Sequence, residues 1–116
     1  MKLAEVLEAL SLAADAPEML DKEVEGGYCS DLLSDVMAKA AAGSIWVTNQ
    51  VHPNVVAVAS LIDAAAVIVA GGMQPEQETI KKAKELGIPL FSTDLSAFDV
   101  VGKLYQLGLR GILRNG

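Results

Sequence analysis

Polar side chains that could bind a small molecule gather in four short segments, each of which follows a predicted strand. The segments also contain the only histidine and the only cysteine of the chain. Their amide and hydroxyl groups both donate and accept hydrogen bonds, which suits a neutral or zwitterionic ligand better than a polyanion. The alternative is simple turn chemistry, in which glycine supplies positive φ and Ser or Asp supplies caps. The expected ligand-binding residues are Gly26, Gly27, Thr48, Asn49, Gln50, His52, Gly71, Gly72, Thr93 and Asp94.

The histidine and the cysteine each have a plainer interpretation than catalysis. His52 would give a ligand site a charge that changes near neutral pH, but it also precedes Pro53 and is placed to cap a helix. Cys29 lies just before a predicted helix start, which lowers a thiol pKa, while Asp31 opposes that shift. A hydrolase site of Cys29, His52 and Asn54 is a distant alternative, because a lone cysteine is usually a small buried apolar residue. We therefore expect no catalytic residue.

The glycine pair Gly71-Gly72 does not form a phosphate-binding loop. Such a loop ends in Lys-Ser or Lys-Thr, so that backbone donors and an ammonium group hold the phosphates. Here Met-Gln-Pro-Glu follows the glycines, so Pro75 removes a backbone donor and Glu76 adds negative charge. Neither GxxxxGKS/T nor GxGxxG occurs in the chain. We expect neither ATPase nor kinase activity, and no cofactor.

Carboxylates in this sequence do not have the spacing of a metal site. Asp31 and Asp35 lie one helical turn apart, where like charges repel each other. Lys39 lies one turn beyond Asp35 and offsets its charge. This pattern is typical of a solvated helix face, so we expect no metal.

The composition fits one globular domain with an acidic balance. The 116 residues are 52% apolar and 21% charged, with a net charge of −6. Nine of the fifteen acids fall within residues 1–35, which argues against a nucleic-acid partner because phosphate binding needs clustered Lys and Arg. One cysteine makes no internal disulfide, so we expect a reducing, cytoplasmic location.

Glu5 and Glu8 interrupt the first apolar stretch, which argues against a signal peptide. Residues 55–72 are apolar enough to suggest a membrane span, but Asp63 at their middle favours a buried helix followed by a buried strand, and we expect no membrane partner.

Two hydrophobic periodicities alternate along the chain and predict helices and strands in turn. Apolar residues spaced by three and four predict amphipathic helices, and in the second of these Leu32 and Met37 should face inward. Short aliphatic runs that end at glycine predict buried strands. The expected strands are residues 23–25, 44–48, 65–70, 89–92 and a short last strand at 109–113. The expected helices are residues 3–10, 30–41, 54–63, 75–86 with Gly87 as the C′ residue, and 96–107 with Ser96 as the N-cap.

This alternation predicts an α/β fold for a single domain over residues 1–116. We expect a mostly parallel sheet of four or five strands, with helices packed on it through right-handed crossovers. In such open sheets, ligands bind beyond the carboxyl ends of the strands. The four polar segments should therefore meet at that end of the sheet, which we call the strand-end surface.

Residues 54–63 form a predicted helix that is apolar nearly all round. One face of a sheet cannot cover such a helix alone. A homodimer that buries the remaining face is one solution, since two-fold dimers are the commonest oligomers. The competing explanation is that the N-terminal helix covers it.

Motifs in a fixed order extend over about two-thirds of the chain. They are Trp46-Val47-Thr48, the Ala-rich stretch 54–63, the run 67–70 that closes in Gly71-Gly72, then Pro75, Gly87-Ile88-Pro89, Ser92-Thr93-Asp94 and Phe98, preceded by Gly26-Gly27-Tyr28 and residues 30–37. This order resembles the DRTGG domain, a small α/β module. That module occurs in the N-terminal part of some phosphotransacetylases, beside CBS domains, and as stand-alone bacterial chains, and residues 26–37 look like the stand-alone members.

The resemblance implies a regulatory or ligand-sensing role without catalysis. The family is similar to the N-terminal, non-catalytic domain of HPr kinase/phosphorylase. Where the family often has Gly-Asp-Arg after a strand, this chain has Thr48-Asn49-Gln50, so an anion-binding role of that arginine is not implied. Two functions remain open: a regulatory module that binds a small molecule at the strand-end surface, or an interaction and oligomerisation module without a small ligand. In the second case the domain would associate with a larger metabolic or signalling enzyme.

Overall fold

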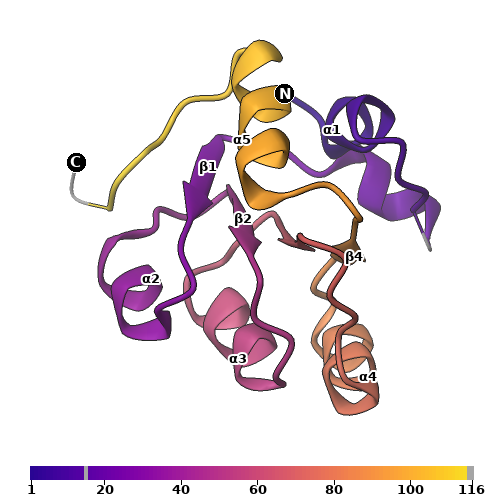
Figure 1. The fold of residues 1–116 in the computed structure, drawn as a ribbon, viewed down its shortest axis with the longest axis vertical. Helices are drawn as coiled ribbons and strands as arrows, with labels where there is room; N and C mark the ends of the chain where they lie inside the picture. Colours follow the sequence, from indigo (N-terminus) through magenta and orange to yellow (C-terminus); the bar gives the residue numbers. More distant parts are fainter. Residues whose placement is uncertain (15, 115–116) are drawn as a thin grey trace.

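Four strands form one parallel sheet in the order β1-β2-β3-β4 within residues 1–14 and 16–114, the part of the chain that the computed structural model describes (Figure 1). Each strand pairs with its neighbour in sequence, as short crossovers favour. The fold-class prediction is confirmed, with four strands rather than five. The strands are β1 (Gly26–Cys29), β2 (Ser44–Thr48), β3 (Ala66–Val69) and β4 (Leu90–Ser92).

Helices cover both faces of this sheet. The crossover helices α2 (Leu33–Lys39), α3 (Asn54–Leu61) and α4 (Gln77–Leu86) lie on one face (Figure 1). Strands that follow each other in sequence with crossovers of one hand must place all these helices on the same side. The opposite face is covered by α1 (Leu3–Ala9) and α5 (Ala97–Gln106). A short 3-10 helix, η1 (Pro17–Asp21), follows α1.

The strands separate two apolar clusters because their side chains alternate between the faces. Ile45 and Ile68 pack with Val6 and Leu104 from α1 and α5. Trp46 points the other way, into the cluster beneath α2, α3 and α4. The proposal that the N-terminal helix covers α3 is therefore wrong, since α1 packs on the opposite face.

Two predicted strands are wrong. At residues 23–25 the backbone forms only an isolated antiparallel bridge between Lys2 and Glu23, and β1 begins at Gly26. Residues 109–113 run beside β1 with an isolated parallel bridge from Gly27 to Gly111, and they do not form a regular strand. The first error has a clear cause: β1 begins with two glycines, whose lack of a side chain hides the strand pattern in the sequence.

The second helix also differs from its prediction. Ser30 accepts a hydrogen bond from the backbone N–H of Leu32 over 3.2 Å, and the helix itself begins at Leu33. Leu32 and Met37 are exposed, because only Val36 of this short helix is fully buried and Leu33 is the residue that packs beside it on the same cluster. By contrast, the predicted caps of the last two helices are confirmed, with Gly87 in the left-handed region at φ 67° and Ser96 accepting from the N–H of Asp99.

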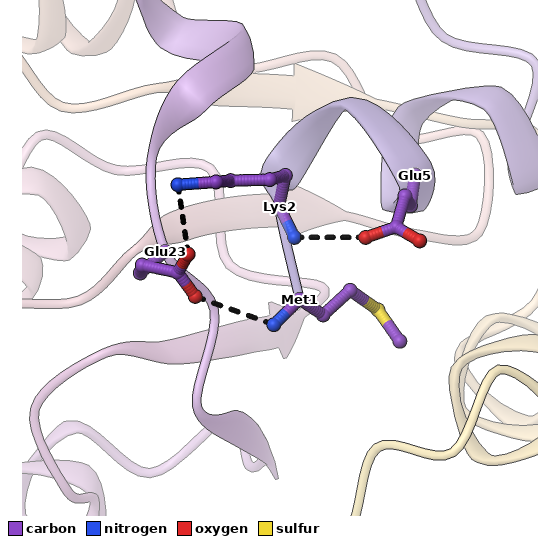
Figure 2. Close-up of polar contacts among 4 residues, drawn as sticks. All are labelled: Met1, Lys2, Glu5 and Glu23. Carbon is purple, nitrogen blue, oxygen red and sulfur yellow. Dashed lines mark hydrogen bonds and ion pairs between the residues drawn. The ribbon is translucent and has the colours of Figure 1, made fainter.

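The start of the chain is held beside the segment that leads into β1. The backbone N–H of Leu3 donates to the carbonyl of Lys22 over 2.8 Å, and that of Val24 donates to Met1 over 2.7 Å. Figure 2 shows the polar contacts around these bonds. The Glu23 carboxylate forms ion pairs with Lys2 Nζ at 2.8 Å and with the amino group of Met1 at 3.3 Å. The hydrogen bond from Lys2 holds the pKa of the Glu23 carboxyl below its ordinary value.

Candidate functional site

Asp31 joins the carboxyl ends of β1 and β2. Its Oδ1 accepts a hydrogen bond from the Thr48 hydroxyl over 2.8 Å and another from the backbone N–H of Asn49 over 2.7 Å. The side-chain amide of Gln50 donates to the Asp31 carbonyl over 3.0 Å. Thr48 is buried, whereas Asn49 and Gln50 are exposed. These hydrogen bonds to Asp31 fix the segment that follows β2, while the side chains of Asn49 and Gln50 remain exposed to solvent.

Gly71 and Gly72 form the same kind of surface after β3. Both lie in the left-handed region, at φ 78° and 76°, where a side chain would be strained. Their N–H groups donate to the carbonyls of Leu95 over 2.7 Å and Thr93 over 3.0 Å, which ties the end of β3 to the segment after β4. A Cβ on Gly71 would lie 3.3 Å from Asn49 Oδ1. The exposed glycines therefore lie beside the polar end of β2.

The structure thus brings together the predicted residues at three strand ends. A Cβ on Gly72 would lie 3.6 Å from Asp94 Oδ1, so the polar surface runs on from the glycines to the segment after β4. Asp31, which joins the first two strand ends, ends the first of the four polar segments, but it was expected on a solvated helix face and not among the binding residues. Its signal in the sequence was its place directly after a strand. The contiguous residues are Thr48, Asn49, Gln50, Gly71, Gly72, Thr93 and Asp94, together with Asp31.

Gly26 and Gly27 do not belong to the strand-end surface. They are the first two residues of β1 and pair in register with Ser44 and Ile45, at the amino end of the sheet. Gly26 is buried, and a Cβ there would lie 2.6 Å from the carbonyl oxygen of Arg110. The prediction placed them after a strand at 23–25, so the error in the strand carried over to the site.

His52 is exposed at the start of α3. Its Nδ1 accepts a hydrogen bond from the backbone N–H of Asn54 over 3.3 Å, and its carbonyl accepts one from Val55 over 3.0 Å. His52 thus supports the first turn of α3 from just before its N-cap residue, Pro53, which has no side-chain cap of its own. A ligand role for His52 stays a prediction.

Cys29 lacks the environment of a nucleophile. Burial raises the pKa of its thiol, and the negative charge of Asp31 raises it further. The reactive form of cysteine is the thiolate, so both effects keep the group neutral at physiological pH. Neighbouring Tyr28 donates its hydroxyl to Asp35 over 2.7 Å, and burial together with that carboxylate raises the pKa of Tyr28 to about 12. The hydrogen bond between Tyr28 and Asp35 ties β1 to α2.

The strand-end surface is acidic. Asp31 and Asp94 provide carboxylates, and its segments contain no Lys or Arg in the sequence. Within residues 1–14 and 16–114, no three His, Cys, Asp or Glu side chains come together in a way that could hold a metal ion. The surface can accept hydrogen bonds through carboxylates and carbonyls and can donate them through the amides of Asn49 and Gln50.

The cavities lie beside this surface rather than on it, and one of them includes Gln74 and Ser92 from its segments. One of about 550 Å³ runs along the outer edge of β4, between η1 and α4, and we call it the β4 groove. A second, of about 340 Å³, lies between α2 and α3 and includes Met37 and Leu61. A third, of about 120 Å³, lies beside β1 and includes Gly27. None of these was predicted, because each depends on how elements pack rather than on a local motif.

No helix in the described part of the chain has the length and apolar character that crossing a bilayer requires.

The family model of the DRTGG domain matches residues 2–107. A similar solved structure is that of the CBS and DRTGG domains of the regulatory region of Clostridium perfringens pyrophosphatase, complexed with its activator, diadenosine tetraphosphate. The TM-score is 0.67 at 18% identity, and the match covers 90% of this chain but 46% of that one. This chain thus spans about half of the regulatory region that it resembles. No curated protein matches this sequence.

Proposed function

Because this chain belongs to the DRTGG domain family, whose members are non-catalytic regulatory domains, we propose that it is a regulatory module that binds a small molecule at the strand-end surface. The binding residues in this proposal are Asn49, Gln50, Gly71, Gly72 and Asp94. Thr48, Thr93 and Asp31 hold their backbone in place.

One observation carries the proposal. The two exposed glycines leave their backbone open between the Asn49 amide and the Asp94 carboxylate, at 3.3 and 3.6 Å from where Cβ atoms would lie. A ligand can approach such a backbone closely because no side chain intervenes. The hydrogen bonds of Gly71 and Gly72 to the segment after β4 fix this surface before any ligand arrives. A preformed surface lowers the entropy cost of binding.

The charge of the surface defines the class of ligand. Asp31 and Asp94 repel anions, and no Lys or Arg of these segments offsets them. The ligand we propose is therefore neutral, zwitterionic or cationic. The activator in the pyrophosphatase structure is a tetraphosphate, and it belongs to a region that contains CBS domains as well. We expect this chain alone not to bind such a polyanion at the strand-end surface.

The test is a titration followed by amide NMR. The probes are the amino acids, the common nucleosides and diadenosine tetraphosphate. A neutral, zwitterionic or cationic probe should shift the resonances of Asn49, Gly71 and Gly72. Asn49→Ala should weaken that binding without changing the melting temperature, whereas Gln106→Ala, an exposed amide on α5, should change neither. Shifts confined to other surfaces, or none with any probe, would contradict the proposal.

His52 allows a separate check of its two roles. If it only caps α3, His52→Ala should cost about 1 kcal/mol of unfolding free energy and leave probe binding unchanged. If it also contacts the ligand, the same variant should weaken binding by more than its effect on stability explains.

The setting of the module is also part of the proposal. Its single cysteine fits a reducing, cytoplasmic location. Because the matched region of the pyrophosphatase regulates a larger enzyme, a larger enzyme is a reasonable partner for this chain as well.

A second function, self-association, is favoured by an apolar surface between α2 and α3. Leu61 and Met37, which line the cavity there, are 66% and 40% exposed, and Leu32 at the start of α2 is 64% exposed. The sheet, α2 and α4 cover the rest of α3, so this surface is what remains for a homodimer to bury. Sedimentation at micromolar concentration should show a dimer that Leu61→Glu converts to a monomer. A monomeric wild-type chain would contradict this function.

A further inference from the structure

The outer side of β4 has backbone groups that no described residue pairs. Val67 donates to the carbonyl of Pro89, and Thr93 donates to Val69, both over 2.9 Å. In a parallel ladder alternate residues face the neighbouring strand, so Phe91 also faces β3. The N–H and C=O groups of Leu90 and Ser92 therefore point outward, and within residues 1–14 and 16–114 they have no hydrogen-bond partner.

These groups form the floor of the β4 groove. Met19 and Glu18 of η1 line one wall, and Ile80, Ala83 and Lys84 of α4 line the other. In Figure 1 β4 lies between the layer of α1 and the layer of α4. The volume of about 550 Å³ lies within the range of ligand-binding pockets, which is about 300–1,000 Å³.

The opposite edge of the sheet, along β1, shows which kind of segment pairs with an edge strand of this protein. There the N–H of Gly27 donates to the carbonyl of Arg110 over 3.1 Å, and Gly27 forms a parallel bridge with Gly111. The edge of β1 is thus covered by an extended segment of the chain itself. An extended segment is also the occupant that matches alternating free N–H and C=O groups along β4.

A second copy of the same strand does not fit. Neighbouring strands lie about 4.8 Å apart. Since β4 forms the floor between η1 and α4, these walls would meet the walls of another copy before two β4 strands could pair. A single extended peptide has no such walls.

We propose that the β4 groove binds an extended peptide segment of a partner protein as an additional strand of the sheet. Successive side chains of a strand point to opposite faces, so they would alternate between the two walls. Toward α4 an acidic side chain complements Lys84, and toward η1 a basic one complements Glu18. Apolar side chains between them pack against Met19 and Ile80.

The test uses the full chain and a displayed library of random linear heptapeptides. Selected peptides should show the alternation of an acidic with a basic or apolar residue. Ser92→Pro removes one outward N–H and should weaken binding on the order of tenfold, as the loss of one hydrogen bond does. Lys84→Glu should shift the selection from acidic to basic residues at the position facing α4.

Two controls separate this site from others. Asn49→Ala lies on the strand-end surface and should leave peptide binding unchanged, so failure of the ligand proposal does not affect this result. In the best selected peptide, N-methylation of every second amide should abolish binding, and methylation of the other amides should not. No enrichment of any peptide, binding that Ser92→Pro leaves as tight as in the wild type, or equal effects of both methylation patterns would overturn the proposal.

Discussion

The two outer edges of the sheet differ: the β1 edge is covered by another part of the chain, and the β4 edge is open. Along β1, residues 109–113 run beside the strand (Figure 1). The cavity beside β1 has a volume of only about 120 Å³. Along β4, the cavity is about 550 Å³ and its floor is the backbone of the strand. Exposed strand edges are usually covered or made unattractive, because they pair readily with other chains. The uncovered edge, along β4, is the one at which we propose that a peptide binds.

Glycine explains how the β1 edge is closed. A Cβ on Gly26 would lie 2.6 Å from both the carbonyl oxygen of Arg110 and the Cγ1 of Ile112. Only a residue without a side chain allows the C-terminal segment to come so close. The residues of β4 are Leu, Phe and Ser, and no residue in the described part of the chain pairs with the outward backbone groups of this strand.

Proline substitutions at two adjacent positions, one in β4 and one just after it, should differ most in how much unfolding free energy they cost. Thr93→Pro removes the hydrogen bond to Val69 and should cost about 3 kcal/mol of unfolding free energy. Ser92→Pro removes an outward N–H and should cost less than about 1 kcal/mol. Urea unfolding measures both. Equal losses would mean that Ser92 is paired and that the edge is not open.

Substitutions of the two β1 glycines test the closed edge. Gly26→Val forces the C-terminal segment away and should cost about 1–3 kcal/mol. Gly27→Ala is the matched control, since its Cβ would meet only the Ile45 carbonyl at an ordinary 3.7 Å. Thermal unfolding would report both variants. A Gly26→Val protein as stable as wild type would show that residues 110–112 do not pack on β1.

A smaller effect is expected from Tyr28, which ties β1 to α2. Tyr28→Phe removes the hydrogen bond to Asp35 and should cost about 1 kcal/mol at neutral pH. Because the pKa of Tyr28 is raised from 10.0 to about 12, its contribution to stability is complete below pH 10 and is lost as the pH rises to 12. The wild type and the variant should therefore converge in stability over that range. A difference that persists at pH 12 would contradict this assignment.

Local signals in the sequence were sufficient for most of the fold. The aliphatic runs of β2 and β3, and the caps at Gly87 and Ser96, are encoded within a few residues. The β1 strand was misplaced because its glycines read as a turn. Its edge partner lies some 80 residues later, and the pairing of Gly27 with Gly111 has no local pattern.

The strand-end surface was predictable for a different reason. Parallel strands place their carboxyl ends together, so Asn49, Gly71 and Asp94 could be grouped from the strand positions alone. Asp31 could not be assigned its role, because its hydrogen bonds to Thr48 and Asn49 depend on how the loops are fixed in three dimensions. The β4 groove depends on the separation of η1 from α4, which no periodicity encodes.

Amide hydrogen exchange of the free protein tests the contrast between the edges most directly. The N–H of Gly27 is bonded to Arg110 and should exchange slowly, as should those of Phe91 and Thr93, which face β3. The N–H groups of Leu90 and Ser92 should exchange much faster than these neighbours, since they face the open groove. Protection of Leu90 and Ser92 equal to that of Phe91 would contradict the open edge, and fast exchange at Gly27 would contradict the closed one.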